Sequence, residues 1–218
     1  MPGRTWQRTS EVDQTINTAL RRVPVSAVYL AGLGPLALLV WQGVRGDLGV
    51  DPVKTVEYAL GLYGLRLILV GLAVSPLRRF AGVNLLRFRR AIGLLAFFYI
   101  SLHLATWLLL DIQLRWSEIW ADIVKRPYIT VGMAGFAMLL PLALTSNNRS
   151  VRWLGAAAWQ KLHRIPYAAA VAGVVHYLWL VKAWPLSPIL YAAVVFSLLL
   201  IRLLAMRNRL RAPRTARA

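Results

Sequence analysis

Trp159–Trp179, WQKLHRIPYAAAVAGVVHYLW, is the most informative segment of this chain. Its length and apolar character predict a helix that crosses a lipid bilayer, and it carries two of the three histidines, His163 and His176. The third, His103, lies in an equally apolar stretch, Ile92–Trp107. Because an imidazole within hydrocarbon is costly and rare, all three are candidate functional residues. Histidines that face each other across a helical bundle most naturally hold a haem iron.

The composition places most of the remaining chain in the membrane as well. The protein has 218 residues, of which 58% are hydrophobic, and several apolar runs reach the ~20 residues that cross a bilayer core. It has no cysteine, which excludes disulfides, thiolate catalysis and iron–sulfur or zinc centres held by cysteine. Any redox chemistry must therefore come from a bound cofactor.

The net charge of +18 could indicate a nucleic-acid-binding protein. The basic residues cluster instead at alternate ends of the apolar runs, as the positive-inside rule requires. We therefore expect a lipid bilayer around the chain and no nucleic-acid partner.

Six membrane spans are predicted from the apolar runs. Five of them cover residues 23–44, 56–77, 91–112, 128–145 and 189–206, and the remaining one, fifth in the chain, carries His163 and His176 and ends near Lys182. Because six is even, both termini lie on one side, and the Arg/Lys-rich stretches mark that side as cytoplasmic. Residues 1–22 are expected to form a cytoplasmic arm, 23–206 the transmembrane domain, and 207–218 a basic cytoplasmic tail. Residues 111–127 have the mixed composition of an amphipathic segment at the outer interface. Within it, we expect residues 111–125, part of the longest outer loop, to contact a partner. The fold class is all-α: an integral membrane bundle of six helices.

His103 and His176 are predicted to lie at the same depth. The third and fifth spans both run outward, and His103 lies 12 residues past Ala91 while His176 lies 11 past Ile165. These separations correspond to depths of about 18 and 16 Å, in the outer half of a core about 30 Å thick. A b-type haem with two axial histidines requires this arrangement. The alternative is a hydrogen bond across the bundle, but the rarity of such residues in membranes favours the ligand interpretation.

His163 and Arg89 form a candidate second site nearer the cytoplasm, about 20 Å below the first. His163 would be an iron ligand, with Arg89 as an unusual axial partner or, more easily for a group that stays protonated, as a propionate anchor. The alternative is that His163 is an ordinary interfacial residue. Thirteen residues of unbroken helix would turn His163 about 140° away from His176. Pro166, between them, could distort the helix enough to correct this.

Arg66 lies in the middle of the second predicted span, too deep for its charge to reach the surface easily. No acidic residue lies at its depth in any span, so we expect Arg66 to face the bundle interior and to bind a haem propionate. The alternative is a polar contact in the bundle reached through a water defect. Glycines such as Gly61, Gly132 and Gly173 fit close helix packing and would also leave room for a flat macrocycle.

Four segments of the chain resemble one known family: GDLGVDPVKTVEYALGLYGL, LAVSPLRRF, RFRRAIGLLAFFYISLHL and WQKLHRIPYAA. They are similar to the haem-binding membrane subunit of the bacterial methionine sulfoxide reductase system, the MsrQ (YedZ) family of the ferric-reductase-like transmembrane superfamily. The resemblance covers about residues 46–206. That superfamily pairs histidines on its third and fifth helices to stack two haems. Here the third span keeps only His103, and Arg89 occupies the place of the missing ligand, so the resemblance implies one haem at His103 and His176 and a second only with a different partner for His163.

The resemblance implies an electron-transfer subunit of the bacterial inner membrane rather than a catalytic one. Electrons would enter from the quinone or flavin reductase side, pass through haem b, and leave to a periplasmic molybdopterin-dependent reductase that repairs oxidised methionines. FMN is implied by the resemblance alone, because no phosphate-binding glycine loop is found. Two alternatives come from other classes: a small transporter with Arg66 and the histidines along its substrate path, and a structural anchor for a partner enzyme.

Overall fold

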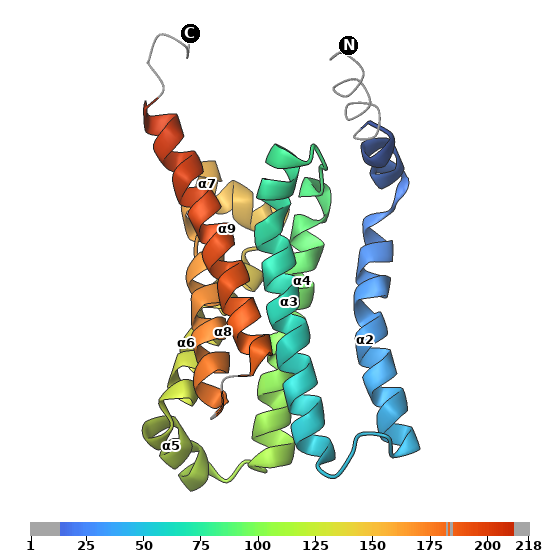
Figure 1. The fold of residues 1–218 in the computed structure, drawn as a ribbon, viewed down its shortest axis with the longest axis vertical. Helices are drawn as coiled ribbons and strands as arrows, with labels where there is room; N and C mark the ends of the chain where they lie inside the picture. Colours follow the sequence, from blue (N-terminus) through green and yellow to red (C-terminus); the bar gives the residue numbers. More distant parts are fainter. Residues whose placement is uncertain (1–13, 182, 184, 212–218) are drawn as a thin grey trace.

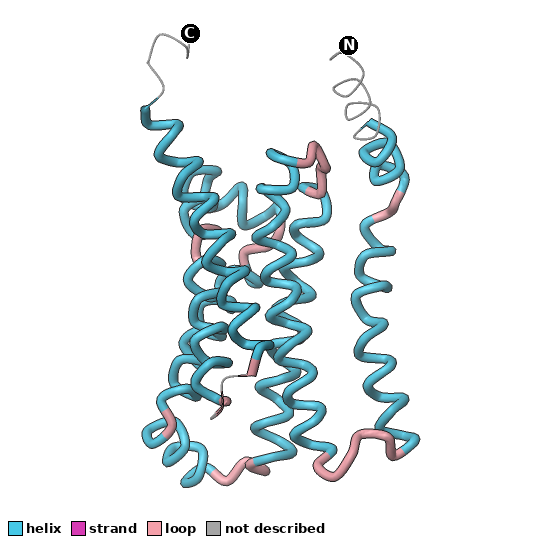
Figure 2. The backbone as a smooth tube through the Cα atoms, viewed as in Figure 1, coloured by secondary structure: helices cyan, strands magenta, loops and turns pink. Residues whose placement is uncertain are grey.

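The computed structural model describes residues 14–181, 183 and 185–211, and these residues form a bundle of helices without a strand (Figures 1 and 2). Five helices are long and apolar enough to cross a membrane, and α8 is a shorter apolar helix of 15 residues. The helices of the bundle are α2 (Val25–Arg45), α3 (Pro52–Phe80), α4 (Arg89–Thr106), α6 (Pro127–Leu144), α8 (Pro166–Leu180) and α9 (Leu186–Arg211). The predicted six-helix membrane bundle is confirmed.

The shorter elements lie at the two ends of this bundle. At one end, residues 14–22 form a helix before α2, and α7 (Asn148–Leu162) lies across the bundle. The connection from α3 to α4 at this end includes a short 3-10 turn, η1 (Leu86–Phe88). The predicted amphipathic segment is the helix α5 (Trp116–Lys125) at the opposite end. A π-helical turn, η2 (Trp107–Asp111), ends α4 next to it.

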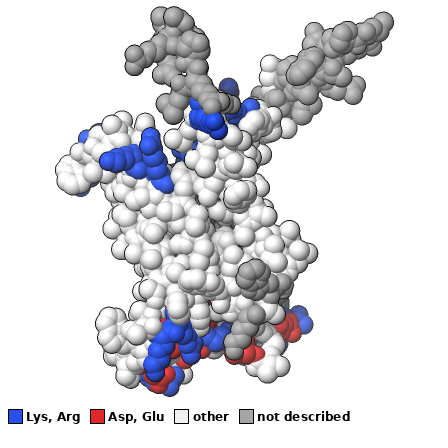
Figure 3. Space-filling view, turned by 60° about the vertical axis from the view of Figure 1, so that its left-hand side comes forward, with Lys and Arg blue, Asp and Glu red and all other residues white. Residues whose placement is uncertain are grey.

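The charges distinguish the two ends. Figure 3 shows Lys and Arg without neighbouring acids at the end that holds α7, and a mixture of basic and acidic residues at the other end. Residues 14–22 and the last turns of α9 lie at the basic end (Figure 1). By the positive-inside rule this end is cytoplasmic, as predicted. The predicted tail at 207–218 is helical as far as Arg211. Residues 212–218 of this tail and residues 1–13 of the predicted arm lie outside the described residues.

Local sequence signals explain where the membrane helices begin and end. Pro52, Pro127 and Pro166 each occupy the first turn of a helix, where the missing N–H is not needed for the helical hydrogen-bond pattern. Asp51 precedes α3, and its side chain accepts a hydrogen bond from the backbone N–H of Lys54 at 3.0 Å. α2 ends at Arg45 and is capped by Gly46, whose φ of 73° is the left-handed conformation that glycine adopts without strain.

The stretch Trp159–Trp179 is two helices rather than the single one predicted. α7 ends at Leu162, α8 begins at Pro166, and His163 lies in the connection between them. Proline lacks the N–H of a helix interior and its ring collides with the preceding turn, so the helix breaks before Pro166 instead of bending through it. The membrane span is therefore confined to α8. The helix α7 has no buried residue and lies at the cytoplasmic end.

The main hydrophobic core lies between α3, α6, α8 and α9 and includes Leu65, Leu69, Leu139 and Val174. α2 is peripheral, with Leu39 as its only buried residue. This arrangement places α3, α4, α6 and α8 around the interior of the bundle.

Candidate functional site

A cavity opens between α3, α4, α6 and α8 toward the outer end of the bundle. It contains about 1190 Å³ of space free of protein atoms, part of it open to the outside. Its walls are mostly apolar, with Leu65, Ile100, Phe136 and Leu139 among the residues that line them. A large apolar cavity with few polar groups is typical of a cofactor-binding site.

His103 and His176 both line this cavity, one on α4 and the other on α8. Their ring centres are 6.2 Å apart, and the ring planes are inclined at 79°. The prediction that the two imidazoles meet at one level is therefore confirmed.

A backbone carbonyl orients each imidazole. Nδ1 of His103 lies 2.8 Å from the carbonyl oxygen of Glu57, and Nδ1 of His176 lies 2.6 Å from that of Tyr128. Because a carbonyl only accepts, Nδ1 of each ring carries the proton and donates it. The lone pair of each histidine is then on Nε2, the nitrogen that remains for a metal.

Two glycines allow the imidazoles to approach these carbonyls. Gly61 and Gly132 each lie one helical turn, four residues, after the accepting carbonyl. A Cβ at Gly61 would lie 3.1 Å from Nδ1 of His103, and a Cβ at Gly132 would lie 2.8 Å from Nδ1 of His176. A side chain at either position would therefore push the ring away from its carbonyl. The sequence predicted room for a macrocycle at these glycines, and the structure shows that they make room for the two imidazole rings.

The geometry fits an iron that brings its own equatorial ligands. The bond from a first-row metal to an imidazole nitrogen is about 2 Å, and the ring centre lies about 1 Å beyond that nitrogen. Two imidazoles that bind one metal from opposite faces therefore have ring centres about 6 Å apart. The described residues contain no cluster of three or more His, Cys, Asp or Glu that could hold a bare metal ion. Two protein ligands beside a large apolar cavity therefore suit a metalloporphyrin better than a free cation.

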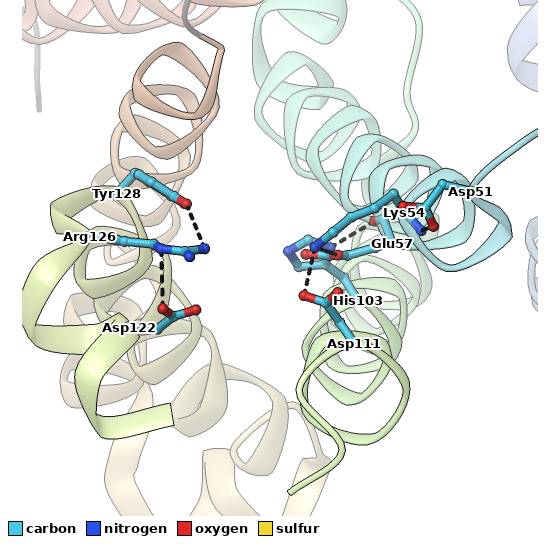
Figure 4. A network of polar contacts seen from close by, with 8 residues as sticks. All are labelled: Asp51, Lys54, Glu57, His103, Asp111, Asp122, Arg126 and Tyr128. Atoms are coloured by element: carbon cyan, nitrogen blue, oxygen red, sulfur yellow. Dashed lines mark hydrogen bonds and ion pairs between the residues drawn. The ribbon is translucent and has the colours of Figure 1, made fainter. Parts of the chain in front are cut away.

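The outer mouth of the cavity carries charged residues that sequence reasoning missed. Lys54 and Arg126 line the cavity from α3 and from the start of α6, and Glu57 lines it beside Lys54. In Figure 4 the guanidinium of Arg126 points toward the side that holds Lys54 and His103. These residues lie at predicted span ends, where charged side chains are common, so the sequence held no signal that distinguishes them from other interfacial charges.

Arg66 is placed differently from the prediction. Its side chain is exposed on the surface of the bundle rather than in the interior, and it is not among the residues that line the cavity. Its Nε donates to the hydroxyl of Tyr191 on α9 at 2.7 Å. The expected interior orientation is therefore wrong, because the rotation of α3 about its axis is set by packing of its other face. A cofactor-binding role for Arg66 stays a prediction.

The structure brings His163 and Arg89 near each other at the cytoplasmic end. The His163 ring stacks on Trp159 with ring centres 3.8 Å apart, and its Nε2 lies 3.3 Å from the hydroxyl of Thr145. Burial lowers the pKa of His163, and the positive charge of Arg89 lowers it further. The imidazole is therefore held neutral, the form that binds iron. Its role as a ligand stays a prediction.

Comparison with known proteins agrees with these features. Residues 58–174 match the family described as ferric reductase like transmembrane component. Over 186 residues the chain is 49% identical to the protein-methionine-sulfoxide reductase heme-binding subunit MsrQ of Brucella ovis, Brucella canis and Brucella melitensis, covering 85% of this chain and 84% of each relative. The match and the apolar helices make this a multi-pass protein of the bacterial inner membrane. The chain belongs to the MsrQ family.

Proposed function

We propose that this chain binds haem b between His103 and His176 and carries electrons across the membrane as the membrane subunit of a methionine sulfoxide reductase system. The observation that carries this proposal is the facing pair of imidazoles, 6.2 Å apart in an apolar cavity. The name of the 49% identical relatives, a heme-binding subunit of protein-methionine-sulfoxide reductase, supports the same function.

The residues of the chain act by holding and orienting. Nε2 of His103 and Nε2 of His176 would ligate the iron from its two faces, and the carbonyls of Glu57 and Tyr128 keep both rings in one tautomer. When bound, the haem supplies reversible one-electron chemistry. With His103 and His176 both holding the iron, no site on it would remain for a substrate, so this pair of residues would favour electron transfer over catalysis.

The position of the cavity suggests a direction for the electrons. The cavity opens at the outer end, where Trp116 and Trp120 of α5 are exposed, so a periplasmic molybdopterin-dependent reductase would dock there. The donor, a quinone or a flavin reductase, would act from the cytoplasmic side. His163, with Arg89 as an axial partner or propionate anchor, is the site proposed for a second haem there, and FMN is proposed only from the family resemblance.

The visible spectrum of the purified protein tests the haem. We expect a Soret band and, after reduction, the sharp α and β bands of a b-type cytochrome with two axial histidines. His103→Ala and His176→Ala should each lose most of the haem, because a single remaining imidazole holds the iron from one face only. A colourless wild-type protein, or equal haem in the wild type and both variants, would refute the proposal.

A further inference from the structure

Two cations lie on opposite sides of the outer cavity mouth, each beside one of the two histidines. Lys54 precedes Glu57, whose carbonyl orients His103, by three residues. Arg126 precedes Tyr128, whose carbonyl orients His176, by two residues. At 1.5 Å per residue the cations lie about 3–5 Å outward of the carbonyls along their helices. Each axial ring therefore has one cation on its own side, nearer the outside.

Acidic residues hold these cations in place from positions outside the cavity. Nζ of Lys54 lies 2.6 Å from Oδ2 of Asp111, the last residue of the π-helical turn η2, and Nε of Arg126 lies 3.2 Å from Oδ1 of Asp122 (Figure 4). Asp111 and Asp122 are not among the cavity-lining residues. π-Helical turns occur often at functional sites. Here the turn brings a carboxylate from the end of α4 to the cation of α3.

Both cations retain hydrogen-bond donors for a further partner. The Lys54 ammonium has three N–H groups. Among the described residues it contacts the carboxylates of Glu57, at 3.0 Å, and of Asp111. The Arg126 guanidinium has five, of which Nε contacts Asp122 and Nη1 reaches the Tyr128 hydroxyl at 3.5 Å. Both side chains are about half exposed, at 52% and 53%. The charged groups are therefore accessible from the cavity mouth.

The two cations of the cavity lining offer hydrogen-bond donors to an anionic ligand group. Lys54 and Arg126 are these cations and Glu57 is the only carboxylate of the lining, while Asp111 and Asp122 pair with the two cations from outside the cavity. The rest of the wall is mainly apolar. A ligand with a large apolar body and carboxylates at one edge would match both parts.

We propose that Lys54 and Arg126 form a carboxylate clamp that binds the two propionates of the haem, one propionate to each cation. This inference rests on the proposed function. Iron ligation by two histidines leaves the macrocycle free to rotate about the axis through both rings. The clamp would stop this rotation and direct the propionate edge toward the outer surface.

Haem dimethyl ester is the probe that isolates this interaction, because it keeps the iron and the macrocycle but replaces both carboxylates by neutral esters. The full-length protein would be freed of haem and titrated with haem or with the ester, with binding followed by the Soret band. A charge-assisted hydrogen bond contributes about tenfold in affinity, so the wild type should favour haem over the ester by about 100-fold. Lys54→Met or Arg126→Met should each reduce this preference about tenfold, and the double variant should remove it.

Arg115→Gln is the matched control. Arg115 is a cation at the same end, paired with Glu118 at 2.8 Å, and does not line the cavity. Its replacement should leave the preference for haem unchanged. Lys54→Arg and Arg126→Lys should retain most of the preference, because the charge remains.

The outcomes separate the clamp from the proposed function. A wild type that binds haem and the ester equally well overturns the clamp and leaves haem binding intact. A wild type that binds neither overturns the proposed function. The methionine variants should still bind the ester, which shows that they are folded, and an unchanged haem preference in the double variant would also overturn the clamp.

Discussion

Gly132 of α6 lies so close to His176 of α8 that a Cβ on the glycine would be 2.8 Å from Nδ1 of the imidazole. Gly61 of α3 and His103 of α4 repeat this relationship at 3.1 Å. In both pairs the glycine lies four residues after the carbonyl that orients the ring. The same local arrangement therefore positions both imidazoles, His103 on α4 and His176 on α8.

Gly132→Ala should displace His176 from the Tyr128 carbonyl and lower the haem content, because a methyl group closer than 3.0 Å forces the ring to move. Overpacking of this kind costs about 1–3 kcal/mol, which corresponds to about a tenfold or larger loss of haem affinity. Gly61→Ala should have a smaller effect, since its contact is longer. The measurement is Soret absorbance per protein in titrations of the haem-free protein.

Gly93→Ala is the control for both glycine variants. Gly93 lies on α4, the helix of His103, and a Cβ there would meet nothing within 4 Å. The variant should bind haem like the wild type. If Gly132→Ala and Gly93→Ala retain equal haem, the glycine has no part in positioning His176.

Tyr99→Phe should loosen α2 from the bundle. The buried hydroxyl of Tyr99 donates to the carbonyl of Gly32 at 2.6 Å and accepts from the N–H of Leu36 at 3.2 Å, which are one helical turn apart in α2. Its removal leaves both backbone groups without this partner, at a cost of about 1–3 kcal/mol.

Limited proteolysis in detergent checks this prediction, since the connection between α2 and α3 should be cleaved faster in Tyr99→Phe. Haem content should stay at the wild-type level, because Tyr99 does not line the cavity. A haem loss equal to that of His103→Ala would contradict the assignment of Tyr99 to the attachment of α2.

Arg66→Met should retain the haem held by His103 and His176. Arg66 contacts Tyr191 and does not line the cavity, so its loss removes no group from the site. The haem-to-protein ratio and the reduced spectrum provide the measurement, with Tyr191→Phe as the variant that removes the partner instead. A fall in haem content in Arg66→Met alone would restore the sequence-based prediction of a propionate partner.

His163→Gln should leave the spectrum of the outer haem unchanged, because His163 lies at the cytoplasmic end, in the connection from α7 to α8. If the second haem is present, the haem-to-protein ratio should fall by half while the α band of the remaining haem persists. Trp159→Phe is a suitable comparison, because it keeps the imidazole beside an aromatic ring. Complete haem loss in His163→Gln would contradict the placement of the outer haem.

The class of protein, the six spans, their sidedness and the common depth of His103 and His176 could all be predicted before the structure was known. Hydropathy, charge at the span ends and a constant rise per residue are properties of each helix alone, so they can be evaluated before any helices meet. The break before Pro166 was also implied by local chemistry, although the sequence predicted a distortion where the structure has two helices.

Which side chains reach the cavity could not be predicted, because it depends on how the helices pack. The rotation of each helix about its axis depends on how its neighbours pack, and this rotation turns Arg66 to the surface while Lys54 and Arg126 line the mouth. The pairing of each imidazole with a carbonyl over a glycine is likewise a contact between two helices. Such contacts depend on the relative rotation and approach of separate helices, which hydropathy and spacing along one chain do not specify.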